Sequence, residues 1–200
     1  MVTGSADSRR KETDGHGSVS VFQGVYGRRM SPVLRLCVTA MLCALGVVGR
    51  IALWSVPNVQ PVTVLIILIT IYISLPYGLV SALVMACVTN MFMGSLGIWT
   101  LYQSFAWICA ALIAWLLFRK KQNYILMVAY AFLAGFIYGF IVDAISWRIF
   151  VQYNSAATFW AYKVTSLPYD LYHSLGNAVF MYFLDPLFGK AFEAVILRRR

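Results

Sequence analysis

The chain has 200 residues, of which 61% are hydrophobic and only 12% are charged, and its formal net charge is +9. A soluble domain usually carries about 25% charged residues and about 45–50% apolar ones, so the composition excludes a water-soluble fold and predicts a chain embedded in lipid. Because the basic residues gather at the two ends and in one internal segment, we expect contact with anionic lipid and exclude a nucleic-acid partner.

Residues 1–29 differ from the rest of the chain, since they are rich in Gly, Ser and charge and show no apolar period. This composition predicts a disordered basic and polar tail. The segment lacks the apolar stretch of a signal peptide, and Met30 is an alternative start. Residues 30–200 are predicted to form one membrane domain.

Six apolar stretches follow the tail and predict an all-α, polytopic bundle of six transmembrane helices. They cover Val33–Leu53, Val59–Leu75, Tyr77–Met93, Trp99–Phe118, Tyr124–Trp147 and Lys163–Phe188. The second and third stretches are short, and Leu75-Pro76-Tyr77-Gly78 between them predicts a tight helical hairpin rather than one long helix. Pro186, after Asp185, predicts a break or bend near the end of the last helix.

The distribution of Lys and Arg predicts the orientation of the bundle. With six spans both termini share a side, and all but three of the 16 basic residues fall on that side; the exceptions are Arg50, Arg148 and Lys163. The positive-inside rule therefore predicts cytoplasmic termini in a plasma-membrane protein.

Costly polar residues from nearly every span converge on the opposite, outer level. Together with aromatic residues at the same depth they form the set Asn58, Gln60, Asn90, Trp99, Tyr102, Gln103, Asp143, Trp147, Tyr169, Asp170 and His173. This level predicts a cavity that opens outward and binds a small, partly aromatic or amphipathic molecule. An interfacial belt without any ligand would explain the Trp and Tyr residues, but the amides, carboxylates and His require partners or water.

Asp170 and His173 are three residues apart and share a helix face. The pair is compatible with a metal pair, a proton relay or a ligand clamp. The structural alternative is that Asp170 pairs with Arg50 or Lys163 to hold helices together. A metal site is not predicted, because the only other histidine, His16, lies in the tail.

Small residues recur at spacings of four in two spans. Ala40 and Ala44 form one such step, and Ala131, Gly135 and Gly139 form another. Such spacings permit close helix approach, so one face is expected to be internal and the other to dock a partner.

Several chemistries are excluded by absent motifs. The sequence contains no GxxxxGK[ST] phosphate loop, no HExxH and no GxSxG. The cysteines form no CxxC pair and are predicted to be small buried apolar residues; they are Cys37, Cys43, Cys87 and Cys109. A binding protein or transport subunit without a cofactor is therefore favoured over an enzyme.

Several segments resemble the substrate-binding S-components of energy-coupling factor (ECF) vitamin transporters. The resemblance covers residues 33–200, and a tryptophan-containing stretch is most similar to the cobalamin-type branch. The segments that carry it are Ala40-Met41-Leu42-Cys43-Ala44, Pro57-Asn58-Val59-Gln60-Pro61-Val62-Thr63, Gly94-Ser95-Leu96-Gly97-Ile98-Trp99-Thr100-Leu101-Tyr102-Gln103, Tyr138-Gly139-Phe140-Ile141-Val142-Asp143 and Asp170-Leu171-Tyr172-His173-Ser174-Leu175-Gly176-Asn177.

The resemblance implies a subunit of an ABC importer that captures a vitamin from outside, such as cobalamin or a related corrinoid. Such a subunit docks on a membrane T-component carrying two ATPases and topples to release its substrate inside. By this resemblance the outer-level residues are candidates to hold the vitamin, and Ala40 and Ala44 to contact the T-component. The alternatives are a non-catalytic, MreD-like scaffold of a cell-envelope assembly, and a membrane enzyme using Asp170 and His173 as acid–base groups.

Overall fold

The computed structural model describes residues 30–197, with side chains as far as Ala194. The predicted tail 1–29 and the last three arginines lie outside these residues. Six helices make up the described chain: α2 (Pro32–Ala52), α3 (Val62–Tyr72), α4 (Leu75–Phe92), α5 (Ile98–Phe118), α6 (Tyr124–Phe150) and α7 (Ala156–Leu197). The prediction of an all-α bundle is confirmed, and each predicted span corresponds to one helix.

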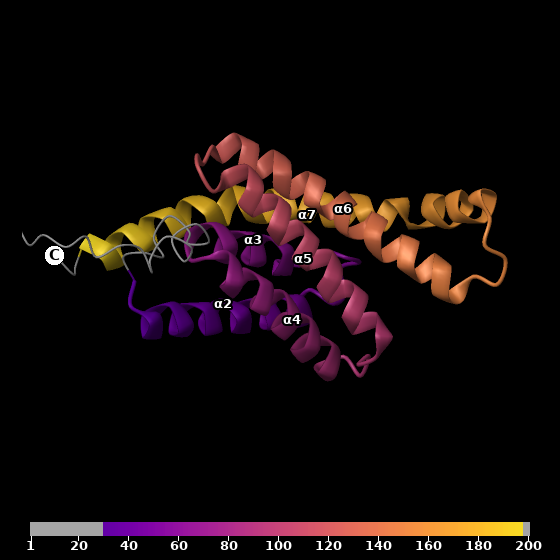
Figure 1. Cartoon of the computed structure of the whole chain (residues 1–200), viewed down its shortest axis with the longest axis horizontal. Coiled ribbons are helices and arrows are strands. Elements are labelled where there is room, and N and C mark those ends of the chain that lie inside the picture. The colour runs from indigo at the N-terminus through magenta and orange to yellow at the C-terminus, as the bar shows by residue number, and fades with distance from the viewer. Residues whose placement is uncertain (1–29, 198–200) are drawn as a thin grey trace, which may run out of the picture.

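The helices run back and forth along the long axis of the molecule. Figure 1 shows the start of α2, the α5–α6 connection and the end of α7 toward one end of this axis, and the connections α2–α3, α4–α5 and α6–α7 toward the other. The basic run Arg119, Lys120 and Lys121 therefore lies toward the same end as the described termini. The two described termini thus lie toward the same end of the molecule.

Four helices are long and apolar enough to cross a membrane, namely α2, α4, α5 and α6. Their outward faces carry many large apolar side chains; Met41 and Ile125, for example, are 71% and 74% exposed. Contiguous apolar surface of this kind is rare on soluble monomers and is typical of a lipid-facing or partner-facing exterior.

Helix α3 differs from the predicted second span, because it has only 11 residues and is buried on every side. It contacts all five other helices. At 1.5 Å per residue it is about 16 Å long, roughly half the hydrocarbon thickness of a bilayer. Its late start has a local cause: Pro57 and Pro61 fix the backbone around Asn58, which has a φ of 58°.

The hairpin between α3 and α4 turns earlier than predicted. Ile73 and Ser74 make the turn, and Pro76 lies in the first turn of α4, where its missing N–H is not required. Gly78 contributes to close packing rather than to the turn, because a Cβ atom there would overlap the side chain of Thr70 on α3.

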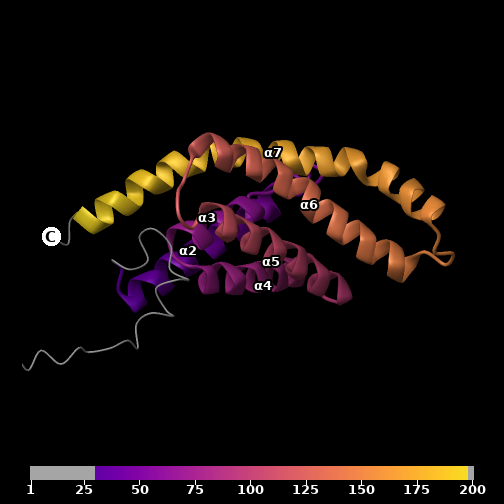
Figure 2. The ribbon, with the colours of Figure 1, turned by 45° about the horizontal axis from the view of Figure 1, so that its top comes forward.

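The last helix is longer than predicted and does not break. It begins at Ala156 rather than near Lys163, and continues for 42 residues through Pro168 and Pro186. Figure 2 shows α7 arching over the rest of the bundle. Of the two predicted alternatives at Pro186, the break is therefore wrong, whereas a bend agrees with the curve of this helix in Figure 2.

The two small-residue faces have different environments. Ala131, Gly135 and Gly139 are buried, and a Cβ atom at Gly135 would lie 2.6 Å from the Cα of Ser174, so this α6 face packs directly on α7. Ala40 and Ala44 instead lie on the exposed side of α2. The internal face of α2 is formed by other residues, including Cys43 and Gly46.

The prediction of four buried cysteines is correct only for Cys43. Its thiol donates to Ser81 Oγ at 3.3 Å. Cys37 is exposed on α2, and Cys87 and Cys109 are partly exposed. All four thiols are free, and no group of His, Cys, Asp or Glu that could hold a metal occurs among residues 30–197.

Candidate functional site

A cavity of about 410 Å³ lies where the α2–α3 connection meets the ends of the surrounding helices. Arg50 closes it from α2, Met93 from the end of α4 and Trp99 from the start of α5. Helices α6 and α7 form the remaining wall. These segments belong to the end of the bundle opposite its described termini (Figure 1).

Most of the residues predicted for the outer level line this cavity. They are Asn58, Gln60, Trp99, Gln103, Asp143, Tyr169 and Asp170. The structure thus brings together side chains from the α2–α3 connection and from α5, α6 and α7, more than 100 positions apart in sequence.

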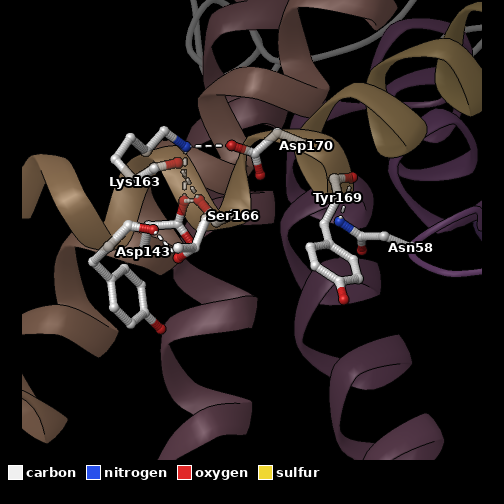
Figure 3. A network of polar contacts seen from close by, with 8 residues as sticks. Asn58, Asp143, Lys163, Ser166, Tyr169 and Asp170 are labelled. Atoms are coloured by element: carbon white, nitrogen blue, oxygen red, sulfur yellow. Dashed lines mark hydrogen bonds and ion pairs between the residues drawn. The ribbon is translucent and has the colours of Figure 1, made fainter.

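A charged cluster on α6 and α7 forms one wall. Lys163 Nζ donates to Asp143 Oδ2 at 2.7 Å and also to Asp170 Oδ2, so that it lies between the two carboxylates (Figure 3). Ser166 Oγ donates to Asp143 Oδ2 at 2.5 Å. Lys163, Ser166 and Asp170 share one face of α7 because they are three and seven residues apart.

Gly139 makes room for this cluster. A Cβ atom at this position would overlap the carboxylate of Asp170, so a larger residue would push α6 and α7 apart. The prediction that Asp170 pairs with Lys163 or Arg50 is confirmed for Lys163. Arg50 has other partners.

Arg50 forms the opposite wall, in the last turn of α2. Its Nη1 donates to Thr89 Oγ1 at 2.8 Å, and its guanidinium carbon lies 5.3 Å from the centre of the Trp107 ring. Nη2 is 3.5 Å from Gln103 Oε1. Among the described residues Arg50 has no carboxylate partner.

His173 lies behind the cavity wall and is fully buried. Trp107 Nε1 is 3.0 Å from Thr63 Oγ1, and this oxygen is 3.0 Å from His173 Nε2. His173 Nδ1 lies 2.9 Å from the Asn58 carbonyl oxygen, which only accepts hydrogen bonds. Nδ1 therefore carries the proton and Thr63 donates to Nε2. Each polar side-chain atom in this series of hydrogen bonds from Trp107 to Asn58 then has a partner.

This arrangement corrects the grouping of Asp170 with His173. Although they share a helix face, Asp170 turns to Lys163 and the cavity, whereas His173 is saturated by Thr63 and Asn58. His173 positions the α2–α3 connection on α7 and does not line the cavity. Asn58 adds a second tie, since its Nδ2 donates to the Tyr169 carbonyl oxygen at 2.9 Å (Figure 3).

Three more predicted residues lie outside the cavity lining. Asn90 is fully buried and donates to Gln103 Oε1 at 2.9 Å, so it orients a lining residue from behind. The Tyr102 ring packs edge-on against Trp99, with centroids 5.0 Å apart. Trp147 donates to Thr158 Oγ1 at 3.1 Å and steadies the α6–α7 connection instead.

Some lining residues were not in the predicted set: Arg50, Tyr138, Gly139 and Ser166 contribute to the walls. The sequence places Arg50 near the outer end of the first span and suggests it as a partner of Asp170, and it suggests Gly139 for helix packing. Ser166 had a detectable signal, since its spacing places it between Lys163 and Asp170 on one helix face. Tyr138 had none, because a Tyr in an apolar run resembles a core residue.

No protein-family model, curated protein or solved structure matches this chain, so the cavity and the surfaces around it carry the functional argument.

Proposed function

We propose that this protein is the substrate-binding subunit of an ECF-type importer and that it captures a vitamin from outside the cell. The observation that carries the proposal is the cavity itself. Seven residues that the sequence places at one depth converge on it, at the end of the bundle away from the basic segments. A concave site with apolar walls and a few convergent polar groups is the usual form of a small-molecule site.

The proposed orientation places the described termini in the cytoplasm. It rests on the position of Arg119, Lys120 and Lys121, which the positive-inside rule assigns to the cytoplasmic face. The cavity then faces outward, where a scavenged vitamin is first encountered. The four long apolar helices and their exposed apolar side chains supply the lipid-facing surface.

The size of the cavity bears on the choice of vitamin. About 410 Å³ lies toward the lower end of the range of about 300–1,000 Å³ for small-molecule sites. This volume favours a compact vitamin. Cobalamin, the ligand that the sequence resemblance implies, stays a prediction, and a corrinoid would require the α2–α3 connection or the α6–α7 wall to move outward.

The proposed partner is a membrane T-component with two ATPases, docked on the outer face of α2. Support comes from the contrast between the two small-residue steps. The α6 step is occupied by α7, whereas Ala40 and Ala44 are exposed between larger residues such as Met41. A second helix can approach α2 closely only at such a step.

Ligand binding by the purified protein tests the proposal directly. Full-length protein in detergent, without ATP, is titrated with cobalamin, folate, pantothenate and riboflavin, and binding is followed by calorimetry and thermal unfolding. We expect one vitamin to bind tightly and raise the unfolding temperature. The absence of binding and of any thermal shift across the panel, together with co-purification of cell-wall proteins, would favour the scaffold alternative.

The docking face is tested separately by Ala40→Trp and Ala44→Trp. Added bulk blocks helix approach, so uptake of the bound vitamin into cells should be lost while its affinity for the purified subunit stays unchanged. Leu133→Trp is the control, because Leu133 is 55% exposed on α6 and lies away from the step formed by Ala40 and Ala44 on α2. Loss of ligand binding in Ala40→Trp would show that this face supports the cavity instead.

A further inference from the structure

The two walls of the cavity carry opposite charge. Arg50 lines it from α2, and Asp143 and Asp170 line it from α6 and α7, which lie on the other side of the bundle from α2 in Figure 1. Lys163 does not line the cavity, and it lies between the two carboxylates (Figure 3). The charges of the cavity are therefore separated.

The positive wall retains most of its charge. Arg50 is at the C-terminal end of α2, where the helix dipole offsets roughly half an elementary charge at most. Its other partners, Thr89, Gln103 and the Trp107 ring, are neutral. A guanidinium has five N–H donors in a planar fork, and these contacts use two of them. The remaining donors suit a carboxylate or phosphate.

The negative wall retains one net charge, since two carboxylates share one ammonium. The donors of this cluster, Lys163 Nζ and Ser166 Oγ, bond to the Oδ2 atoms of the carboxylates. Within residues 30–197 the Oδ1 atoms of Asp143 and Asp170 have no hydrogen-bond donor, and neither is sealed from solvent as a buried unpaired atom. Both atoms therefore have unused acceptor capacity, and Asp143, whose side chain is 11% exposed against 4% for Asp170, is the more accessible carboxylate to a cationic or N–H group of a ligand.

Apolar and aromatic side chains connect the two charged walls. Tyr138 and Val142 of α6 line the cavity, with Trp54 and Trp99 at its rim, 59% and 39% exposed. Tyr138 is held in place because its ring stacks on Trp107, with centroids 5.2 Å apart. A flat body fits between these surfaces.

We propose that the cavity selects a compact zwitterion: a flat molecule with an anionic group against Arg50 and a cationic or N–H-donating group against the Oδ1 atoms of Asp143 and Asp170. This inference rests on the proposed ligand-binding function and narrows its substrate class. A monoanion bound at Arg50 would leave the carboxylates without a partner of opposite charge, and a monocation bound at the carboxylates would leave Arg50 without one. Only a molecule with both charges matches both walls.

A series of three probes of one shape tests the proposal. They are 4-(aminomethyl)benzoate, a zwitterion with charges at opposite ends of a ring, 4-methylbenzoate, an anion, and 4-methylbenzylamine, a cation. Binding of each to full-length protein in detergent is measured by competition and thermal unfolding. We expect the zwitterion to bind about ten- to a hundredfold more tightly than either singly charged analogue, as one charge-assisted contact implies. Equal affinity within the series, or no binding of any probe, would overturn the inference.

Variants then assign each charge to its wall. Arg50→Gln should reduce affinity for the zwitterion to that for the cation, whereas Asp143→Asn should reduce it to that for the anion. Arg148→Gln is the control for overall charge, because Arg148 is exposed and does not line the cavity. If Arg50→Gln fails to fold, Arg50→Lys replaces it and should keep the preference for a carboxylate over its neutral analogue. The same loss for all probes in both variants would contradict the assignment.

The outcome separates this inference from the proposed function. Tight binding of a neutral or singly charged vitamin would leave the importer proposal standing and overturn the zwitterion. Selective binding of the zwitterion without binding of any vitamin would support the zwitterion inference and overturn the importer proposal.

Discussion

Two polar networks lie side by side at the cavity end of the bundle, and they differ in how fully their atoms are bonded. In the chain from Trp107 through Thr63 and His173 to the Asn58 carbonyl, every donor has an acceptor. In the cluster of Lys163 with Asp143 and Asp170, neither Oδ1 atom has a hydrogen-bond donor among the described residues. A saturated buried network holds helices together, whereas one with spare capacity beside a cavity is suited to a ligand.

The largest change in folding stability is expected from Lys163→Met, which removes the cation of the second network. It leaves two carboxylates facing each other with little solvent, since the Lys163 side chain is only 13% exposed. Removing one partner of a buried ion pair costs about 3–5 kcal/mol of folding free energy. We expect a loss of about 3 kcal/mol, measured by denaturant unfolding in detergent.

Partial rescue identifies the cause of that loss. Adding Asp143→Asn to Lys163→Met removes the repulsion and should recover about half of the lost stability. Lys190→Met is the control, because Lys190 is exposed on the same helix. A single variant as stable as this control would show that the cluster does not hold α6 to α7.

A smaller loss is expected from Thr63→Val, which keeps the shape of the side chain. The change leaves the Trp107 N–H without an acceptor and His173 Nε2 without a donor, both fully buried. Unsatisfied buried groups cost about 1–3 kcal/mol each, so we expect about 2 kcal/mol in total after relaxation. Thr165→Val, on the exposed side of α7, should change stability little.

The same variant separates the two networks functionally. Because Thr63 does not line the cavity, probe affinity in Thr63→Val should stay within about threefold of the unmodified protein once both are folded. A tenfold loss of affinity at unchanged stability would mean that the saturated chain also binds the ligand.

The smallest effect concerns Asn177, one turn beyond His173 on α7. It is fully buried, and neither amide atom has a partner among the described residues. Replacing an unsatisfied buried amide by an apolar group of similar size is neutral or stabilising. Asn177→Leu should therefore raise stability by up to about 1 kcal/mol in thermal unfolding. A clear loss of stability would show that this amide is hydrogen-bonded.

Much of the fold follows from the apolar pattern. Stretches such as Tyr124–Trp147 were located to within a few residues of α6, because their length and composition permit little else in lipid. The bounds of α3 were not predictable, since a largely apolar stretch of 17 residues looks the same whether it crosses a bilayer or is enclosed by other helices. The start of α7 was missed because Lys163 separates residues 156–162 from the apolar run that follows, although only Thr158 among those residues is polar.

The sequence predicted the depth of the site residues along the spans, but not the direction in which their side chains face. Depth along each span located Asp143, Asp170 and Gln103, and all three line the cavity. Depth does not give rotation about the helix axis, so Asn90 and His173 were included although they face the interior. Depth likewise left open whether Asp170 pairs with Arg50 or with Lys163, and the structure pairs it with Lys163.

The enclosed position of α3 has a consequence for how the chain is assembled. A helix about 16 Å long cannot stably cross a bilayer alone, although its residues are almost entirely apolar. In the proposed membrane setting α3 enters with α4 as a hairpin and settles only when α5, α6 and α7 surround it. Chains that end before α5 are therefore expected to leave this segment without a stable location, and they should be early targets of membrane quality-control proteases.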